Sequence, residues 1–166
     1  MPDVIAPGLR VLFVGINPGL WSGAVGHHFA RPGNRFWKAL HTSGFTERIV
    51  SPFHERQLLD RGLGITNMVR RTTRAAAELS PEELERGVRR LRAKVIRHRP
   101  RIVAFLGLSA YRVAVRRPRA RVGRQADRFG GARVWVLPNP SGLNAHYQMP
   151  ALTRIFGRLR AATMVR

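Results

Sequence analysis

Two short apolar segments end in the same way, and this feature constrains the fold more than any other. Residues 11–16 stop at Asn-Pro-Gly (17–19), and residues 134–137 stop at Pro-Asn-Pro-Ser-Gly (138–142). A continuous apolar run of this length is typical of a strand that is buried on both faces, as in a parallel sheet. Proline ends such a strand because it has no N–H to donate to a neighbouring strand.

The two Asn-Pro segments are therefore predicted to be loops at strand ends. Ligands of open α/β sheets bind at the carboxyl ends of the strands, so both loops are expected to border one pocket. Gly19 and Gly142 would let another molecule approach the backbone closely. We expect the functional site at this edge of the sheet.

The rest of the chain alternates between predicted strands and helices. Further strands are expected over 63–69 and 102–106, and helices over about 34–43, 53–61, 81–99, 109–116 and 148–163. Ser80-Pro81-Glu82-Glu83 is a capping box that starts the third of these helices. Residues 18–34 are expected to form an irregular loop, and residues 116–133 a basic connection.

This alternation predicts the fold class. We expect a single domain over residues 1–166 with a three-layer α/β/α architecture and a central, mostly parallel sheet.

Positive charge is concentrated in the second half of the chain. Residues 1–85 hold 10 Lys or Arg and 8 Asp or Glu, whereas residues 86–166 hold 20 and 1. Such an imbalance predicts a polyanionic partner, with nucleic acid as the first candidate and an anionic membrane as the second. The alternative is a GC-rich genome that favours arginine, because the chain has 28 Arg and only 2 Lys.

The sequence contains no cysteine, and its six histidines are scattered apart from the adjacent His27 and His28. Disulfides, iron–sulfur clusters and cysteine nucleophiles are therefore excluded, and we expect neither a metal nor a cofactor. No apolar stretch approaches the ~20 residues that span a bilayer, and the N-terminus lacks a signal-peptide pattern. We expect a cytoplasmic protein that acts as a monomer.

Four motifs together resemble one family. They are Gly15-Ile16-Asn17-Pro18-Gly19, then Phe29-Ala30-Arg31-Pro32 with Asn34-Arg35-Phe36-Trp37, then Gly64-Ile65-Thr66-Asn67-Met68-Val69, and finally Asn139-Pro140-Ser141-Gly142. In this order and spacing the chain resembles the mismatch-specific uracil-DNA glycosylases (family 2 of the uracil-DNA glycosylase superfamily) and the related thymine-DNA glycosylases. The likeness extends from Ala6 to the final helix.

The resemblance implies an enzyme that flips deoxyuridine, usually opposite guanine, out of double-stranded DNA. It would then hydrolyse the N-glycosidic bond without metal or cofactor. An enzyme that acts on a flipped base requires a snug pocket to hold that base. Asn17 is the first catalytic candidate, and its amide would hold a water against the anomeric carbon. Because an amide is no useful base near neutral pH, catalysis would rest on positioning and on stabilising the departing base. Asn67 matches a second catalytic asparagine of the thymine-glycosylase branch. Either asparagine can instead be read as a turn residue.

The resemblance also implies substrate-binding residues. Phe29 matches the aromatic on which the base stacks, and the backbone amides of Ile16 and Phe29 match the groups that bind uracil's carbonyl oxygens. Ser22 lies where the family has a small residue beside the C5 edge of uracil. Thr73 is a weaker substrate-binding candidate, on the thymine-glycosylase branch that Asn67 also matches. The alternative for Phe29 is an ordinary core residue.

The late loop is expected to act on DNA rather than on the bond. Ser141 and Gly142 match backbone donors to a phosphate, and Leu143 matches the wedge that fills the space left by the flipped nucleotide. Gln148 aligns with a glutamine that reads the opposite guanine. The chain departs from its relatives at Ala145, where they often carry arginine.

Two alternatives remain open at this point. One is another branch of the superfamily, with broad-range or single-strand activity. A branch that activates water with a carboxylate is disfavoured because residues 11–46 contain no Asp or Glu. The other alternative is a catalytically idle nucleic-acid-binding module that keeps the fold.

Overall fold

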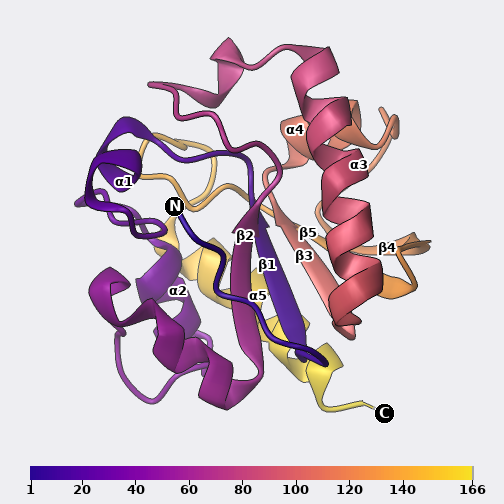
Figure 1. Cartoon of the computed structure of the whole chain (residues 1–166). Coiled ribbons are helices and arrows are strands. Elements are labelled where there is room, and N and C mark those ends of the chain that lie inside the picture. The colour runs from indigo at the N-terminus through magenta and orange to yellow at the C-terminus, as the bar shows by residue number, and fades with distance from the viewer. Residues whose placement is uncertain (166) are drawn as a thin grey trace.

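The computed structural model describes residues 1–165, and its centre is a five-stranded sheet with the strand order β2-β1-β3-β5-β4 (Figure 1). Three parallel pairings join β2, β1, β3 and β5, and β4 runs antiparallel to β5 at one edge. This architecture confirms the predicted α/β fold class. The strands are β1 (Val11–Gly15), β2 (Leu63–Asn67), β3 (Ile102–Leu106), β4 (Gly123–Phe129) and β5 (Ala132–Leu137).

Helices cover both faces of this sheet (Figure 1). One face packs against α2, α5 and the 3-10 helix η1, and the other packs against α3 and α4. The helical elements are α1 (Leu20–Val25), α2 (Phe36–Thr42), η1 (Pro52–Arg61), η2 (Ala76–Glu78), α3 (Pro81–His98), α4 (Leu108–Ala114) and α5 (Met149–Thr163). Within residues 1–165, none of these helices is both long and apolar enough to cross a membrane.

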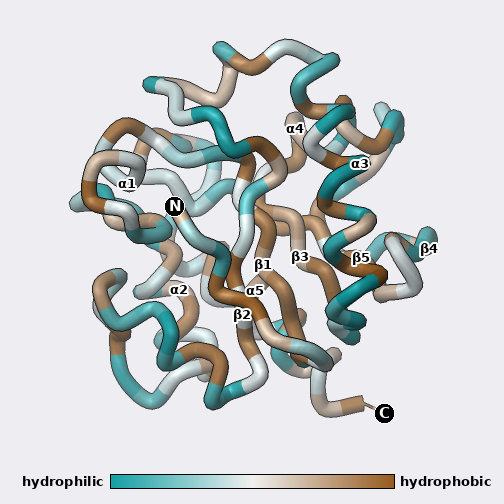
Figure 2. Tube along the Cα trace, in the orientation of Figure 1, coloured by the Kyte–Doolittle hydropathy of each residue, from teal (hydrophilic) through white to brown (hydrophobic). Residues whose placement is uncertain are grey.

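The apolar strands supply two separate cores, one on each face. Phe13 of β1 packs edge-on against Phe36 at 5.4 Å between ring centroids, on the side of α2 and α5. Phe105 of β3 packs edge-on against Tyr111 at 4.9 Å, on the side of α3 and α4. Figure 2 shows β1 and β3 as hydrophobic along their length in the middle of the molecule. Because successive side chains point to opposite faces, a strand between two cores must be apolar throughout.

Local signals set several helix ends, and the capping box of α3 was predicted. In the capping box of α3, Ser80 Oγ accepts from the Glu83 N–H at 3.1 Å and a Glu83 carboxylate oxygen accepts from the Ser80 N–H at 2.9 Å. Asn34 Oδ1 accepts from the Phe36 N–H at 2.9 Å at the start of α2. Gly62 ends η1 with a φ of +67°, a conformation that glycine adopts without steric cost.

Two predictions about irregular segments were wrong. Residues 18–34 contain the short helix α1, which has six residues and no side-chain N-cap, so it leaves almost no sequence signal. Residues 116–133 contain β4, an edge strand whose side chains are mostly exposed. An edge strand has a partner on one side only and tolerates the polar residues that made this segment look like a connection.

Candidate active site

A cavity of about 740 Å³ opens at the carboxyl ends of the parallel strands, at the edge where the site was predicted. Each of four strands contributes a residue at or just beyond its end: Asn17 after β1, Asn67 on β2, Gly107 after β3 and Asn139 after β5. Loops 73–79 and 141–147 form further parts of its wall. Among the described residues 1–165, the lining contains no Asp or Glu.

The Asn17 side chain is held by the loop that follows β2. Its Nδ2 donates to the Arg71 carbonyl at 2.8 Å and to Thr73 Oγ1 at 2.7 Å. The Thr73 hydroxyl donates its own proton to the Ala75 carbonyl at 2.9 Å, so its oxygen is available to accept from Asn17. With both amide protons used in this way, Oδ1 is fixed as the atom that can accept a hydrogen bond from a bound molecule.

Backbone contacts tie the same two loops together. The Thr73 N–H donates to the Pro18 carbonyl at 3.1 Å, and Gly19 and Thr73 form an isolated bridge. Thr73 is buried, with 3% of its surface exposed. Thr73, which was predicted to bind substrate, lines the cavity, and its hydroxyl contacts the Asn17 amide and the Ala75 carbonyl.

Gly15 forms the point where three site residues meet. It pairs with Asn67 in the β1–β2 register. A Cβ at this position would lie 2.4 Å from Asn67 Oδ1 and 3.3 Å from Cζ of Phe29, so no other residue fits without displacing them. No described part of the chain makes the close approach to the backbone that was predicted at Gly19, since nothing lies within 4 Å of a Cβ built there.

Phe29 forms one wall of the cavity rather than part of a closed core. Its backbone has a φ of +51°, which is uncommon for a residue other than glycine. Its ring lies 4.2 Å from that of Phe36, centroid to centroid, with the planes tilted by 35°. Residues with such backbone angles cluster at binding sites, where the surrounding structure holds them.

His28 is a site residue that the sequence reasoning did not single out. It is buried, and its Nε2 lies 2.9 Å from the Pro2 carbonyl, so this nitrogen carries the proton and donates. Nδ1 is then an acceptor and lies 3.5 Å from Asn67 Nδ2. Burial lowers the pKa of His28 from its ordinary value of 6.5, and this keeps the ring neutral. The adjacent His27 and His28, directly before Phe29, were the sequence feature that could have indicated this residue, but the pair was considered only as a metal site.

The His27–His28 segment is anchored by a buried carboxylate. Glu55 accepts from the His28 N–H at 2.8 Å and lies 3.1 Å from His27 Nδ1. Ser22 is also buried, and its Oγ accepts from the Ala30 N–H at 3.0 Å. Both contacts fix the loop that carries Phe29. Within residues 1–165, no group of three or more His, Asp or Glu side chains is arranged to hold a metal ion.

The late loop is docked onto the start of α2. A Cβ at Gly142 would lie 2.7 Å from the Gly33 carbonyl, so the close approach predicted for Gly142 is made by another part of the chain. Leu143 lines the mouth of the cavity and is 70% exposed. Ser141 also borders the cavity, whereas Gln148 is exposed at the start of α5 and lies outside its lining.

Arg35 holds this loop in place and was not predicted as a site residue. Its guanidinium donates to the carbonyls of Ser141 at 2.7 Å, Asn144 at 3.0 Å and Pro140 at 3.4 Å, and also to that of Tyr147. Its backbone N–H donates to the Pro140 carbonyl at 3.0 Å. One side chain thus satisfies four carbonyls of the loop that carries Leu143, and hydrogen bonds from a charged donor are stronger than neutral ones.

The comparison with protein families decides what kind of protein carries this site. The family model of the Uracil DNA glycosylase superfamily matches residues 2–160. The chain belongs to this superfamily. A solution NMR structure of a candidate uracil DNA glycosylase from Methanosarcina acetivorans has the same fold, with a TM-score of 0.65 and 17% identity over 96% of each chain. Membership of the uracil DNA glycosylase superfamily supports DNA glycosylase activity on a DNA substrate.

The described lining of the cavity combines several kinds of polar group with aromatic surface. Asn17 Oδ1 can accept a hydrogen bond from water, and the walls offer further amides, hydroxyl groups, two imidazoles (His28 and His146), two guanidinium groups (Arg31 and Arg74) and the ring of Phe29. No carboxylate is present in the described lining, so no Asp or Glu side chain is available there as a general base.

Proposed function

We propose that this chain belongs to the mismatch-specific branch of the superfamily and removes uracil from U·G pairs in double-stranded DNA. The fixed Asn17 amide is the observation that carries the proposal. Asn17 Nδ2 donates its two protons to the Arg71 carbonyl at 2.8 Å and to Thr73 Oγ1 at 2.7 Å. Oδ1 is therefore free to accept a hydrogen bond, and it lies beside a pocket large enough for a base.

The proposed reaction is hydrolysis at the anomeric carbon. The oxygen of a water held by Asn17 Oδ1 forms a bond to C1′ as the C1′–N1 bond breaks, and uracil leaves with the bonding electron pair. The water's surplus proton passes to solvent or to the departing base, because an amide does not accept it. The products are free uracil and an abasic site. Without a strong base, the rate depends on the leaving group, so electron-poor bases are released faster.

The other pocket residues then have defined roles in binding the base. Phe29 provides the stacking surface, which is worth about 1–3 kcal/mol per base by substitution in other systems. Asn67 lies beside Gly15 with its Nδ2 3.5 Å from His28 Nδ1, and in this proposal it contacts the edge of the base. Ser22 and the backbone of Ile16 complete the pocket.

On the DNA side, we propose that Leu143 enters the space left by the flipped nucleotide. Its 70% exposure at the mouth of the cavity supports this role, since an apolar side chain in water gains by inserting between bases. Ser141 and Gly142 contact a phosphate. Gln148 lies outside the pocket lining, as a residue that reads the opposite strand would.

The test is release of uracil under single-turnover conditions from U·G, U·A and single-stranded substrates. We expect U·G to be the best substrate. Asn17→Ala should slow release by about 10²–10³-fold, the range seen when one positioned polar group is removed from an active site, while binding of an abasic duplex persists. Gln148→Ala should reduce the preference for U·G over U·A without affecting single strands.

Three results would contradict the proposal. Near wild-type release by Asn17→Ala would remove the catalytic assignment. Equal rates on U·G and single-stranded DNA would place the chain in a broad-range or single-strand-active branch instead. Binding of DNA with no abasic product from any uracil substrate would identify a catalytically idle module.

A further inference from the structure

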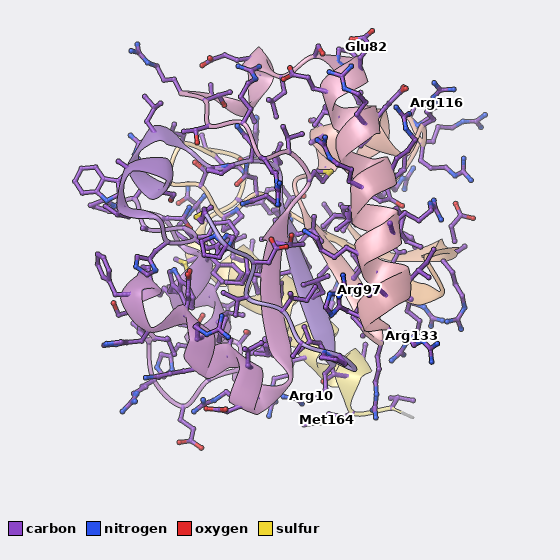
Figure 3. The ribbon with its side chains drawn as sticks, in the orientation of Figure 1. Arg10, Glu82, Arg97, Arg116, Arg133 and Met164 are labelled. Atoms are coloured by element: carbon purple, nitrogen blue, oxygen red, sulfur yellow. The ribbon has the colours of Figure 1, made fainter. Side chains whose placement is uncertain are left out.

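A second group of arginines lies at the end of the sheet opposite to the cavity. Figure 3 labels three of them, Arg10, Arg97 and Arg133, which lie together near Met164 and far from Glu82 at the start of α3. We call this group the amino-edge surface. Its members are Arg10, Arg61, Arg97, Arg101, Arg133 and Arg160.

The sheet register places four of these residues in a row. Arg10 and Arg101 directly precede Val11 and Ile102, which pair with each other, and Arg133 pairs with Ile102 on the next strand. Backbone hydrogen bonds join the same row: Arg10 N–H to the Gly62 carbonyl at 2.7 Å, and Arg133 N–H to the Arg101 carbonyl at 3.0 Å. Arg61 precedes β2 on the other side of Arg10. Four adjacent strands therefore each bring one arginine to this edge.

Helix ends add charge beside the row. Arg97 lies in the last turn of α3, and Arg160 lies in the last turn of α5. Arg10, Arg61 and Arg160 line a cavity of about 450 Å³, in which Glu47 is the only carboxylate among the described lining residues.

Within residues 1–165, none of these six guanidinium groups forms an ion pair with a carboxylate. Among the other described arginines, Arg71, Arg116 and Arg117 are the ones that do. Among the described residues, the Arg10 guanidinium donates only to the Arg61 carbonyl, at 3.0 and 2.7 Å. A set of like charges without counter-charges repels itself and attracts a polyanion.

The DNA that occupies the catalytic cavity cannot neutralise this surface. A five-residue strand is about 16 Å long, so the row lies on the far side of the domain from the cavity mouth. A short duplex is stiff on this length scale and does not wrap around the domain. The surface is therefore left open to a second polyanion.

We propose that the amino-edge surface binds the sugar–phosphate backbone of a second segment of duplex DNA, so that one protein links two duplexes. Four strands ~4.8 Å apart make a row of about 14 Å. Measured along the helix axis, this length spans about four phosphates of one DNA strand. The inference goes beyond the excision reaction and needs no uracil.

The test uses undamaged 16-base-pair duplexes and the full chain. Native mass spectrometry counts duplexes per protein, and energy transfer between donor- and acceptor-labelled duplexes reports bridging in solution. We expect complexes of one protein with two duplexes. If three phosphates are neutralised at the second site, its affinity should fall about 40-fold between 50 and 200 mM salt.

Two matched variants separate this surface from general positive charge. Arg97→Gln/Arg101→Gln/Arg133→Gln should abolish the second binding event and leave the first one, as well as single-turnover excision, unchanged. Arg86→Gln/Arg89→Gln/Arg90→Gln removes the same charge from the exposed side of α3 and should keep bridging. Thermal melts of both variants control for folding.

Several outcomes would overturn the inference. They are a limit of one duplex per protein at saturating DNA, equal bridging by both triple variants, or bridging only by complexes with two protein copies. Binding of phosphatidylserine vesicles without a second duplex would also reject it and would assign the surface to a membrane. Failure of uracil excision alongside intact bridging would reject the proposed function and leave this inference standing.

Discussion

Replacing Thr73 with valine tests the proposal that Asn17 holds the water that attacks the sugar. Valine has nearly the same shape as threonine but lacks the hydroxyl, so the change removes the acceptor that lies 2.7 Å from Asn17 Nδ2. The Arg71 carbonyl at 2.8 Å would remain as the main contact of that amide. With one of its two anchors gone, the amide can rotate and present NH₂ instead of Oδ1 to the water.

The size of the effect follows from the lost hydrogen bond. A hydrogen bond in a mostly buried position, together with the polar group left unpaired, is worth about 1–3 kcal/mol. If all of it appears in the transition state, uracil release slows by about 5–150-fold. Base binding should change little, because the hydroxyl contacts Asn17 and Ala75 within the chain. We therefore expect a lower kcat with nearly constant KM.

Single-turnover release from a U·G duplex measures this effect, and two variants serve as controls. Thr72→Val changes the neighbouring exposed threonine, whose hydroxyl lies near Gly23 and outside the cavity lining, and it should be almost neutral. Thr73→Ser keeps the hydroxyl and should retain most of the activity. The reasoning is refuted if Thr73→Val is no slower than Thr72→Val, or if Thr73→Ser is as slow as Thr73→Val.

Three further predictions concern residues around the pocket. Arg35→Lys loses most of the hydrogen bonds to the loop that carries Leu143. Excision from duplex DNA should therefore fall about 10-fold or more, while excision from single-stranded DNA should fall less than 3-fold. Equal losses on both substrates would contradict a role specific to this loop. Gly15→Ala should nearly abolish activity because the new Cβ would lie 2.4 Å from Asn67 Oδ1. Gly19→Ala is the control in thermal melts and excision assays, and it should preserve the fold because a Cβ there meets nothing within 4 Å. Since burial lowers the pKa of His28, the unfolded chain takes up a proton near pH 6.5 that the folded chain does not bind, so the free energy of unfolding should fall as the pH drops below 6.5. His28→Gln should weaken this dependence in urea melts at pH 7.5 and 5.5, and a slope unchanged from wild type would show that other groups cause it.

The sequence could predict the elements that depend on local chemistry. The apolar runs of β1, β3 and β5 identified the sheet, and Asn17 at the end of β1 identified the edge that holds the cavity. Asn67 could also be placed correctly, because strands of a parallel sheet end at the same edge.

Other parts of the site leave no comparable signal. Arg35 acts on backbone carbonyls more than 100 residues away, and a carbonyl has no sequence identity that would reveal such a contact. The neutral state of His28 depends on burial and on the Pro2 carbonyl, which only the folded chain brings near. The strand β4 was missed because its exposed, charged residues are equally compatible with a loop.

Arg35, the N-cap of α2, and Phe36, its first residue, support opposite walls of the pocket. Arg35 holds the loop that carries Leu143, and Phe36 supports the ring of Phe29 at 4.2 Å. A single peptide unit therefore fixes the distance between Leu143, which would enter the double helix, and Phe29, on which the extruded base would stack. A one-residue insertion between Phe29 and Arg35 would change this distance, and with it both the depth to which Leu143 inserts and the position of the base.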